Sequence, residues 1–151
     1  VGIPPPFRPV TEFFRFSAIL APHGRRPRRG TINPMIEKKT SVGTVAKSLT
    51  EYWSQHVVAS ANGNLFKVAK GIGSTTWHAH HDQEETFLVL DGDLTVQLRD
   101  GDVHLTAGDL LVVPRGVEHC PVASDDVFLL LVGPEITSTA AGGKPAWSTG
   151  A

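Results

Sequence analysis

Three histidines and two glutamates lie within ten residues of this sequence, in the segment WHAHHDQEET at 77–86. In an extended chain alternate side chains share a face, so His78 and His80 project together and His81 projects the opposite way. Glu85 can join the first two across a turn, which places two imidazoles and a carboxylate together. The segment is therefore part of a metal site or an ordinary polar turn, and alternation alone does not decide between them.

A cation bound in this way needs a further ligand from a distant strand, because a single hairpin cannot surround an ion. The segment GDLLVVPRGVEHC at 108–120 offers one. Pro114 fixes its own φ and Gly116 permits a sharp reversal, so the two residues aim His119 into the next strand. Cys120 alternates away from His119 and is expected to be a small buried side chain rather than a thiolate ligand.

The elements that must position these residues are short strands. Apolar runs of high β-propensity follow one another from about residue 55, and strands at this spacing predict an all-β fold, either a small antiparallel β-barrel or a sandwich. One short N-terminal helix is expected over 44–53, with Thr44 as its N-cap. Two Asp-Gly pairs predict tight type I′ hairpin turns. The expected runs are HVVA, NLFKVAK, STTWHAH, TFLVL, LTVQLR, VHL, DLLVVP, HCPV and VFLLLV, and the turns between them are Asn62-Gly63, Gly71–Gly73, Asp91-Gly92, Asp100-Gly101, Gly108-Asp109 and Ser124–Asp126.

Composition divides the chain into three parts. Residues 1–34 hold seven of the eleven prolines and the basic run RRPRR, which favours an extended or disordered segment. Residues 35–136 are expected to form one folded domain, a size that suits a single core. The tail at 137–151 is small, polar and rich in glycine, so it is expected to be flexible.

Charge and cysteine content restrict the possible partners and the location. The chain has 14 basic and 15 acidic residues, so nothing indicates a nucleic-acid surface. No apolar run approaches the ~18 residues that span a bilayer, and no membrane partner is expected. A single cysteine, Cys120, excludes an intrachain disulfide and suits a reducing compartment, so the predicted location is cytoplasmic.

The two polar segments together resemble the two motifs of the cupin superfamily. The first segment matches His-x-His, four residues, Glu, six residues, Gly, and the second matches Gly, five residues, Pro-x-Gly, two residues, His. The matching residues are His78, His80, Glu85 and Gly92 in the first motif, and Gly108, Pro114, Gly116 and His119 in the second. The resemblance to a small single-domain cupin implies a jelly-roll barrel that binds a metal ion inside through His78, His80, Glu85 and His119.

Two positions depart from the family pattern. The glycine expected six residues before His78 falls on Ile72, and an asparagine that often closes the second motif is Ala123 here. Neither position supplies a ligand in cupins. Glu84 is an alternative carboxylate, but the six-residue spacing to Gly92 favours Glu85, and His81 is expected to be exposed.

The ligand set leaves the reaction open. Nitrogen-rich mixed ligation fits one divalent ion of iron, manganese, nickel, cobalt, copper or zinc. Four protein ligands saturate a tetrahedral zinc, whereas an octahedral ion keeps two positions open for water or substrate. The resemblance implies an enzyme that is dioxygenase-like or mannose-6-phosphate-isomerase-like and acts on a small oxygen-rich molecule. The alternative is a non-catalytic cupin that senses a small molecule or metal, and a homodimer is expected.

Overall fold

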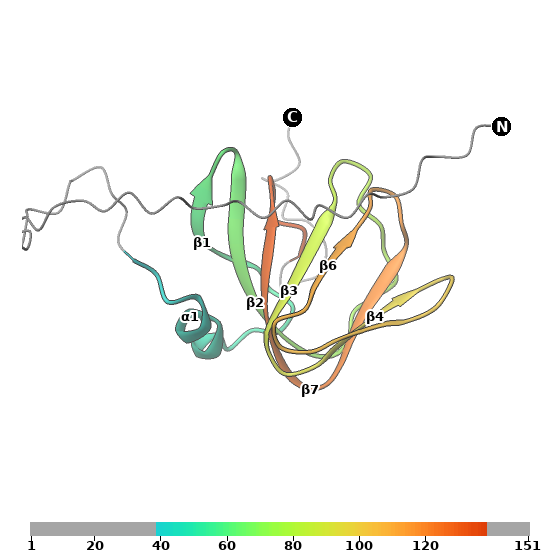
Figure 1. Cartoon of the computed structure of the whole chain (residues 1–151), viewed down its shortest axis with the longest axis horizontal. Coiled ribbons are helices and arrows are strands. Elements are labelled where there is room, and N and C mark those ends of the chain that lie inside the picture. Colours follow the sequence, from blue (N-terminus) through green and yellow to red (C-terminus); the bar gives the residue numbers. More distant parts are fainter. Residues whose placement is uncertain (1–38, 139–151) are drawn as a thin grey trace, which may run out of the picture. The chain divides into compact units, whose positions relative to one another are not determined.

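The computed structural model describes residues 39–138, which form one helix and seven strands (Figure 1). The helix α1 spans Val42–Ser48. The strands are β1 His56–Ala61, β2 Asn64–Ser74, β3 Glu85–Asp91, β4 Leu94–Leu98, β5 Val103–Leu105, β6 Leu110–Val113 and β7 His119–Gly133. The expected helix and nearly all the expected strands are therefore present, and the all-β prediction is confirmed.

The strands form one antiparallel sheet that rolls around a core. Its main path runs β1-β2-β7-β3-β6, and β4 pairs with both β7 and β5. The long strand β7 pairs with β2, β3 and β4, so it belongs to both sides of the roll (Figure 1). Among the described residues no pairing joins β5 to β6, so the barrel is rolled but not closed by hydrogen bonds.

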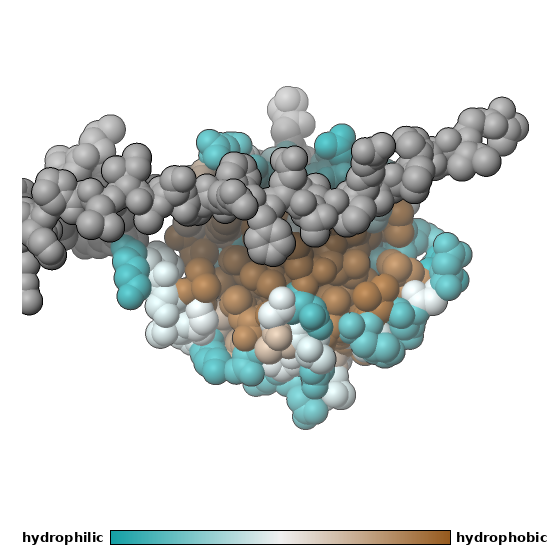
Figure 2. Space-filling view, viewed as in Figure 1, coloured by the Kyte–Doolittle hydropathy of each residue, from teal (hydrophilic) through white to brown (hydrophobic). Residues whose placement is uncertain are grey.

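The inner face of the sheet carries the core. In β3 the side chains of Glu85, Phe87 and Val89 are buried while those between them are half-buried, as the two-residue alternation predicts. Phe87 and Val89 belong to a cluster that also includes buried residues of β4 and β7. The outer face over β2, β7, β3 and β6 is also apolar (Figure 2), and Leu110 on β6 is 61% exposed there.

The helix is shorter than expected and begins earlier. Ser41, not Thr44, is the N-cap, and the helix stops at Ser48. Trp53 lies beyond it with a positive φ of 56°, and its backbone N–H donates to the carbonyl oxygen of Lys70 at 2.7 Å. The prediction of one helix over 44–53 is therefore wrong in its bounds. The apolar spacing that suggested it arises because the segment after the helix packs against β2.

The type I′ turn lies at a different pair of residues from those expected. Asn62 and Gly63 both have positive φ, 52° and 76°, and they connect β1 to β2. The turn at Asp100-Gly101 does connect a hairpin, β4 to β5, but only its glycine has positive φ. Asp91-Gly92 connects β3 to β4, which do not pair with each other. Those two type I′ predictions are therefore wrong.

Two strand predictions also need correction. The expected strand STTWHAH ends at Ser74. The N–H of Thr75 still donates to the carbonyl oxygen of Pro121 at 3.0 Å, but Pro121 has no N–H to donate in return. The residues Ser124–Asp126 do not separate two strands. They lie inside β7 as an irregularity, since Gly73 pairs with Ala123 whereas Gly71 pairs with Val127.

The expected terminal segments lie almost entirely outside residues 39–138. The extension at 1–34 is not described. Of the expected tail, only Thr137 and Ser138 are described, and Thr137 is 3% exposed. Within the described part, no helix is long and apolar enough to cross a bilayer.

Candidate metal centre

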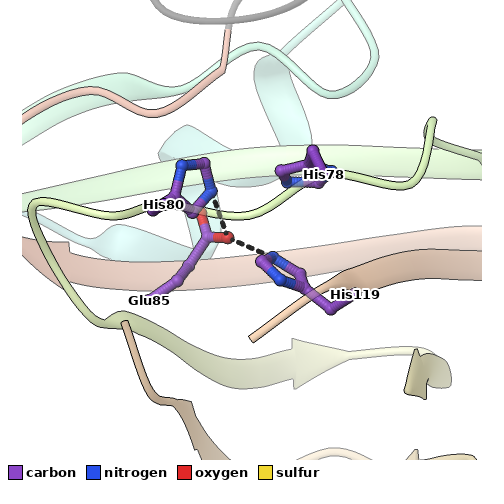
Figure 3. Close-up of side chains that lie close together, drawn as sticks. All are labelled: His78, His80, Glu85 and His119. Atoms are coloured by element: carbon purple, nitrogen blue, oxygen red, sulfur yellow. Dashed lines mark hydrogen bonds and ion pairs between the residues drawn. The ribbon is translucent and has the colours of Figure 1, made fainter. Parts of the chain in front are cut away.

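Four side chains converge inside the rolled sheet. His78, His80, Glu85 and His119 each offer one ligand atom, and these atoms all lie within 4.8 Å of one another. In Figure 3 the imidazoles of His80 and His119 point at the carboxylate of Glu85, and His78 lies beside them. The structure thus brings together all four residues that the sequence singled out.

Backbone hydrogen bonds join the two motif segments. The N–H of His78 donates to the carbonyl oxygen of His119 at 3.1 Å, and the N–H of His119 donates to the carbonyl oxygen of His78 at 2.9 Å. This isolated antiparallel bridge fixes two of the imidazoles side by side, with ring centroids 4.4 Å apart.

The Pro-x-Gly turn fixes the third imidazole. The N–H of Val117 donates to the carbonyl oxygen of Pro114 at 3.2 Å, and Gly116 has a φ of 75°, which only glycine adopts without strain. The turn leaves the N–H of Gly116 free to donate to the carbonyl oxygen of His80 at 2.8 Å. The second motif therefore anchors the loop of the first.

Two imidazoles have a defined tautomer. The Nδ1 atom of His78 lies 2.7 Å from the carbonyl oxygen of Thr76, and that of His119 lies 2.9 Å from the carbonyl oxygen of Val117. A carbonyl oxygen only accepts, so each Nδ1 carries the proton. Each Nε2 therefore faces the cluster. That of His119 carries a proton where it contacts Glu85, and a metal ion would take the place of this proton.

The two oxygens of the Glu85 carboxylate have different partners. Oε2 lies 3.1 Å from His80 Nε2 and 2.9 Å from His119 Nε2. Oε1 accepts a hydrogen bond from the hydroxyl of Thr137 at 2.6 Å and a longer one from the amide of Gln55 at 3.4 Å. One oxygen therefore faces the imidazoles and the other faces the protein.

The pKa values of the cluster follow from burial and these contacts. Burial alone would raise the pKa of Glu85, but hydrogen bonds from His119 and His80 outweigh it and hold that pKa well below its ordinary range. Burial lowers the pKa of His78. For His119 burial acts in the same direction, but the hydrogen bond to Glu85 prevails and raises its pKa.

The donor set fits a transition-metal ion. Nitrogen and carboxylate donors suit such ions, and ligand bonds are about 2.1 Å long. Opposite ligands of an octahedral ion are then about 4.2 Å apart and adjacent ligands about 3.0 Å apart, whereas the four ligand atoms lie within 4.8 Å of one another. The cluster could therefore hold one ion once its side chains close around it.

A small cavity adjoins the cluster. Its volume is about 30 Å³, more than the ~10–15 Å³ that one water molecule needs. Both Glu85 and His78 line it, together with a mainly apolar wall. That lining also includes Trp53, Gln55, Ala69, Thr75, Phe87, Pro121, Leu129, Leu131 and Ser138.

The neighbouring candidates stay outside the cluster. Glu84 and His81 are exposed, as expected, so the buried carboxylate is that of Glu85. Cys120 is buried and its thiol donates to the carbonyl oxygen of Thr75 at 3.2 Å. Lys67 is also buried and is only 2% exposed.

Sequence patterns missed two residues of the centre, Gln55 and Thr137. Gln55 directly precedes β1, and Thr137 lies in the tail that was expected to be flexible. Neither belongs to a motif. The only sequence signal was a polar residue at each end of the strand-rich region.

The fold and the cluster define a class of protein, in which a small rolled antiparallel sheet holds three histidines and one glutamate close together on its inside. Comparison with known proteins agrees, since the family model of the cupin domain matches residues 64–133. A cupin-2 domain containing protein from Shewanella frigidimarina NCIMB 400 is 33% identical, and the match covers 64% of this chain and 94% of that one with a TM-score of 0.61. The chain belongs to the cupin family.

Two further relatives show how far the likeness extends. The uncharacterized protein YdbB of Bacillus subtilis (strain 168) is 28% identical over 85 residues, 56% of this chain and 75% of YdbB. The hydroquinone 1,2-dioxygenase PnpCD, whose structure holds Cd²⁺ and 4-hydroxybenzonitrile, is 19% identical with a TM-score of 0.54, and the match covers 71% of this chain and 83% of that one. At that identity the likeness shows a shared fold alone.

Proposed function

We propose that the protein is a metal-dependent enzyme that acts on a small organic molecule at the centre formed by His78, His80, Glu85 and His119. The observation that carries this proposal is the convergence of four ligand atoms within 4.8 Å beside a cavity. A bound ion of this kind supplies Lewis acidity or, with a redox-active metal, activation of dioxygen.

The number of protein ligands supports an ion with open positions. Four protein ligands saturate a tetrahedral zinc, whereas they leave two positions of an octahedral ion open. Octahedral iron, manganese, nickel or cobalt therefore suits an enzyme better than a closed zinc site.

The cavity supports a dioxygenase-like reaction over a sugar-phosphate isomerase. No lysine or arginine lines it among the described residues. Lys67 donates to the carbonyl oxygen of Glu135, and Lys70 pairs with Asp126. A phosphate would therefore find no cation at the wall. A small, mainly apolar space suits dioxygen or the reacting edge of a small substrate, with the rest of that substrate toward solvent.

Metal analysis followed by oxygen uptake tests this proposal. The purified protein should bind one equivalent of iron or manganese and consume oxygen with one member of a panel of thiols, diketones, phenols and keto acids. His119→Ala should abolish both. If the metal-loaded protein binds a panel member tightly without turnover, the non-catalytic binding module is correct. If it binds no metal, the whole proposal fails.

The remaining expectations concern partners and location. A homodimer stays a prediction, and it is supported by the exposed Leu110 and Val112 on the outer face of β6. The absence of nucleic-acid and membrane partners and a cytoplasmic location stay predictions from charge and cysteine content. Light scattering on the purified protein tests the dimer.

A further inference from the structure

The carboxylate of Glu85 belongs to a buried chain of hydrogen bonds that does not involve the histidines. Thr137 follows β7 and Gln55 precedes β1, so the two residues are 82 positions apart in sequence. Both lie outside the matched region 64–133. The two residues are 3% and 8% exposed, and protein groups are the partners of their side chains.

The contacts fix the direction of every proton in this chain. The backbone N–H of Thr137 donates to Gln55 Oε1 at 2.9 Å, so the other end of that amide is the NH₂ group. That NH₂ group donates to the Thr137 hydroxyl oxygen at 2.5 Å. The hydroxyl has one proton, and it can go only to the ionised Glu85, at 2.6 Å. Gln55 therefore donates to Thr137, and Thr137 in turn donates to Glu85.

These hydrogen bonds occupy one carboxylate oxygen of Glu85 and leave the other to face the histidines. Oε1 accepts from Thr137, with the Gln55 amide 3.4 Å away, whereas Oε2 faces the imidazoles of His80 and His119. A hydrogen bond from a neutral donor to a buried carboxylate is strong and short, so turning Glu85 to present both oxygens inward would break it.

We infer that Gln55 and Thr137 are positioning residues that make Glu85 a ligand through one oxygen only, and so keep a second coordination position open for substrate. The inference rests on the proposed metal centre. Three imidazoles and one carboxylate oxygen fill four of six octahedral positions. If Glu85 bound through both oxygens, one position would remain, and a substrate could not be held through two atoms.

The test uses the full chain loaded with Mn²⁺ and compares Thr137→Val with Thr137→Ser. Valine keeps the shape of threonine but removes the hydroxyl, whereas serine keeps the hydroxyl. Two measurements are made: the affinity for Mn²⁺ by competition with a chelator, and the number of exchangeable waters on the bound ion by water-proton relaxation. The second measurement separates positioning from a merely structural role.

The wild type and Thr137→Ser should hold two exchangeable waters. Thr137→Val should lose about 10–100-fold in Mn²⁺ affinity, the usual effect of removing the partner of a metal ligand, and should hold one water because Glu85 turns to bind through both oxygens. An unchanged water count in Thr137→Val would overturn the inference, whatever happens to the affinity.

The wild-type measurement keeps the inference falsifiable even if Thr137→Val does not fold. One exchangeable water in the wild type would already show that Glu85 binds through both oxygens and would overturn it. A wild type that binds no Mn²⁺ would instead overturn the proposed function. The two failures are therefore distinguishable.

Discussion

The matched region 64–133 and the two segments that flank it contribute different chemistry to the same centre. The matched region supplies the four ionisable side chains, and they face one another across the inside of the sheet. The flanking segments, 53–55 and 137–138, supply uncharged hydrogen-bonding groups and one aromatic ring. The difference indicates that the candidate ligands belong to the matched region, whereas the groups that orient them come partly from outside it.

The flanking segments also hold each other. The hydroxyl of Ser138 donates to the carbonyl oxygen of Trp53, and the N–H of Gln55 donates to the carbonyl oxygen of Ser138 at 3.2 Å. The indole N–H of Trp53 donates to the carbonyl oxygen of Ile72 at 2.8 Å. These contacts explain how segments outside the strands form a fixed wall of the cavity.

The largest expected effect comes from removing a ligand in the matched region. His119→Ala should abolish metal binding, because it removes one of the four metal ligands and leaves the buried Glu85 with one imidazole fewer. The loss should exceed the ~10–100-fold that follows from removing a hydrogen-bond partner of a ligand. Equilibrium dialysis with metal analysis measures this, and circular dichroism checks that the sheet persists. His81→Ala is the matched control: it changes an exposed histidine of the same motif and should retain the metal. Full occupancy in His119→Ala would show that this cluster does not hold the ion.

A smaller effect is expected where the flanking wall meets the strands. A Cβ added at Gly71 would lie 2.5 Å from the Trp53 ring, so Gly71→Ala should lower the free energy of unfolding by about 1–3 kcal/mol through overpacking. Urea denaturation measures it. The same change in a Trp53→Phe background should cost less, because the smaller ring lacks the atoms that clash. Equal costs in both backgrounds would mean that the ring is not fixed against β2.

The smallest expected effect is the pH dependence of the stability of the metal-free protein, which comes from the ionisable side chains of the matched region alone. The pKa of His119 is raised above its ordinary 6.5, so its bond to Glu85 stabilises fully below pH 6.5 and is lost as the pH rises through the raised value. The pKa of His78 is lowered, so below pH 6.5 the unfolded chain takes up that proton first and stability falls.

The pKa of Glu85 is also lowered, and its contribution is present above its ordinary 4.5 and lost as the pH falls further. Stability without metal should therefore be highest near pH 6.5 and fall on both sides. Urea midpoints measured with a chelator between about pH 4 and 9 check this. A steady rise through pH 8 would contradict the direction assigned to His119.

The sequence predicted the cluster more accurately than the elements around it. Alternation and the Pro114-Gly116 turn made these positions candidates, because both depend on local backbone geometry, and the resemblance to the two cupin motifs selected the four residues. The helix bounds, the type I′ turn and the break after Ser74 could not be predicted in the same way. They depend on which strand lies opposite, and at Ser74 that is the strand containing Pro121.

The partners of Glu85 were beyond sequence reasoning for a similar reason. Thr137 and Gln55 are ordinary polar residues at the edges of the strand-rich region, and their role arises only when the two ends of that region meet. No periodicity or spacing encodes a contact between residues 82 positions apart.

The pairing of β7 has a consequence for the order of events during synthesis. Chains emerge from the ribosome from the N-terminus, at about 5–20 residues per second, and β2, β3 and β4 all need β7 as a neighbour. A nascent chain that ends before residue 119 lacks His119, and its β2, β3 and β4 each lack one neighbouring strand. Capture of an ion by all four side chains would therefore follow translation of nearly the whole domain, and the strand edges that β7 covers are exposed until then.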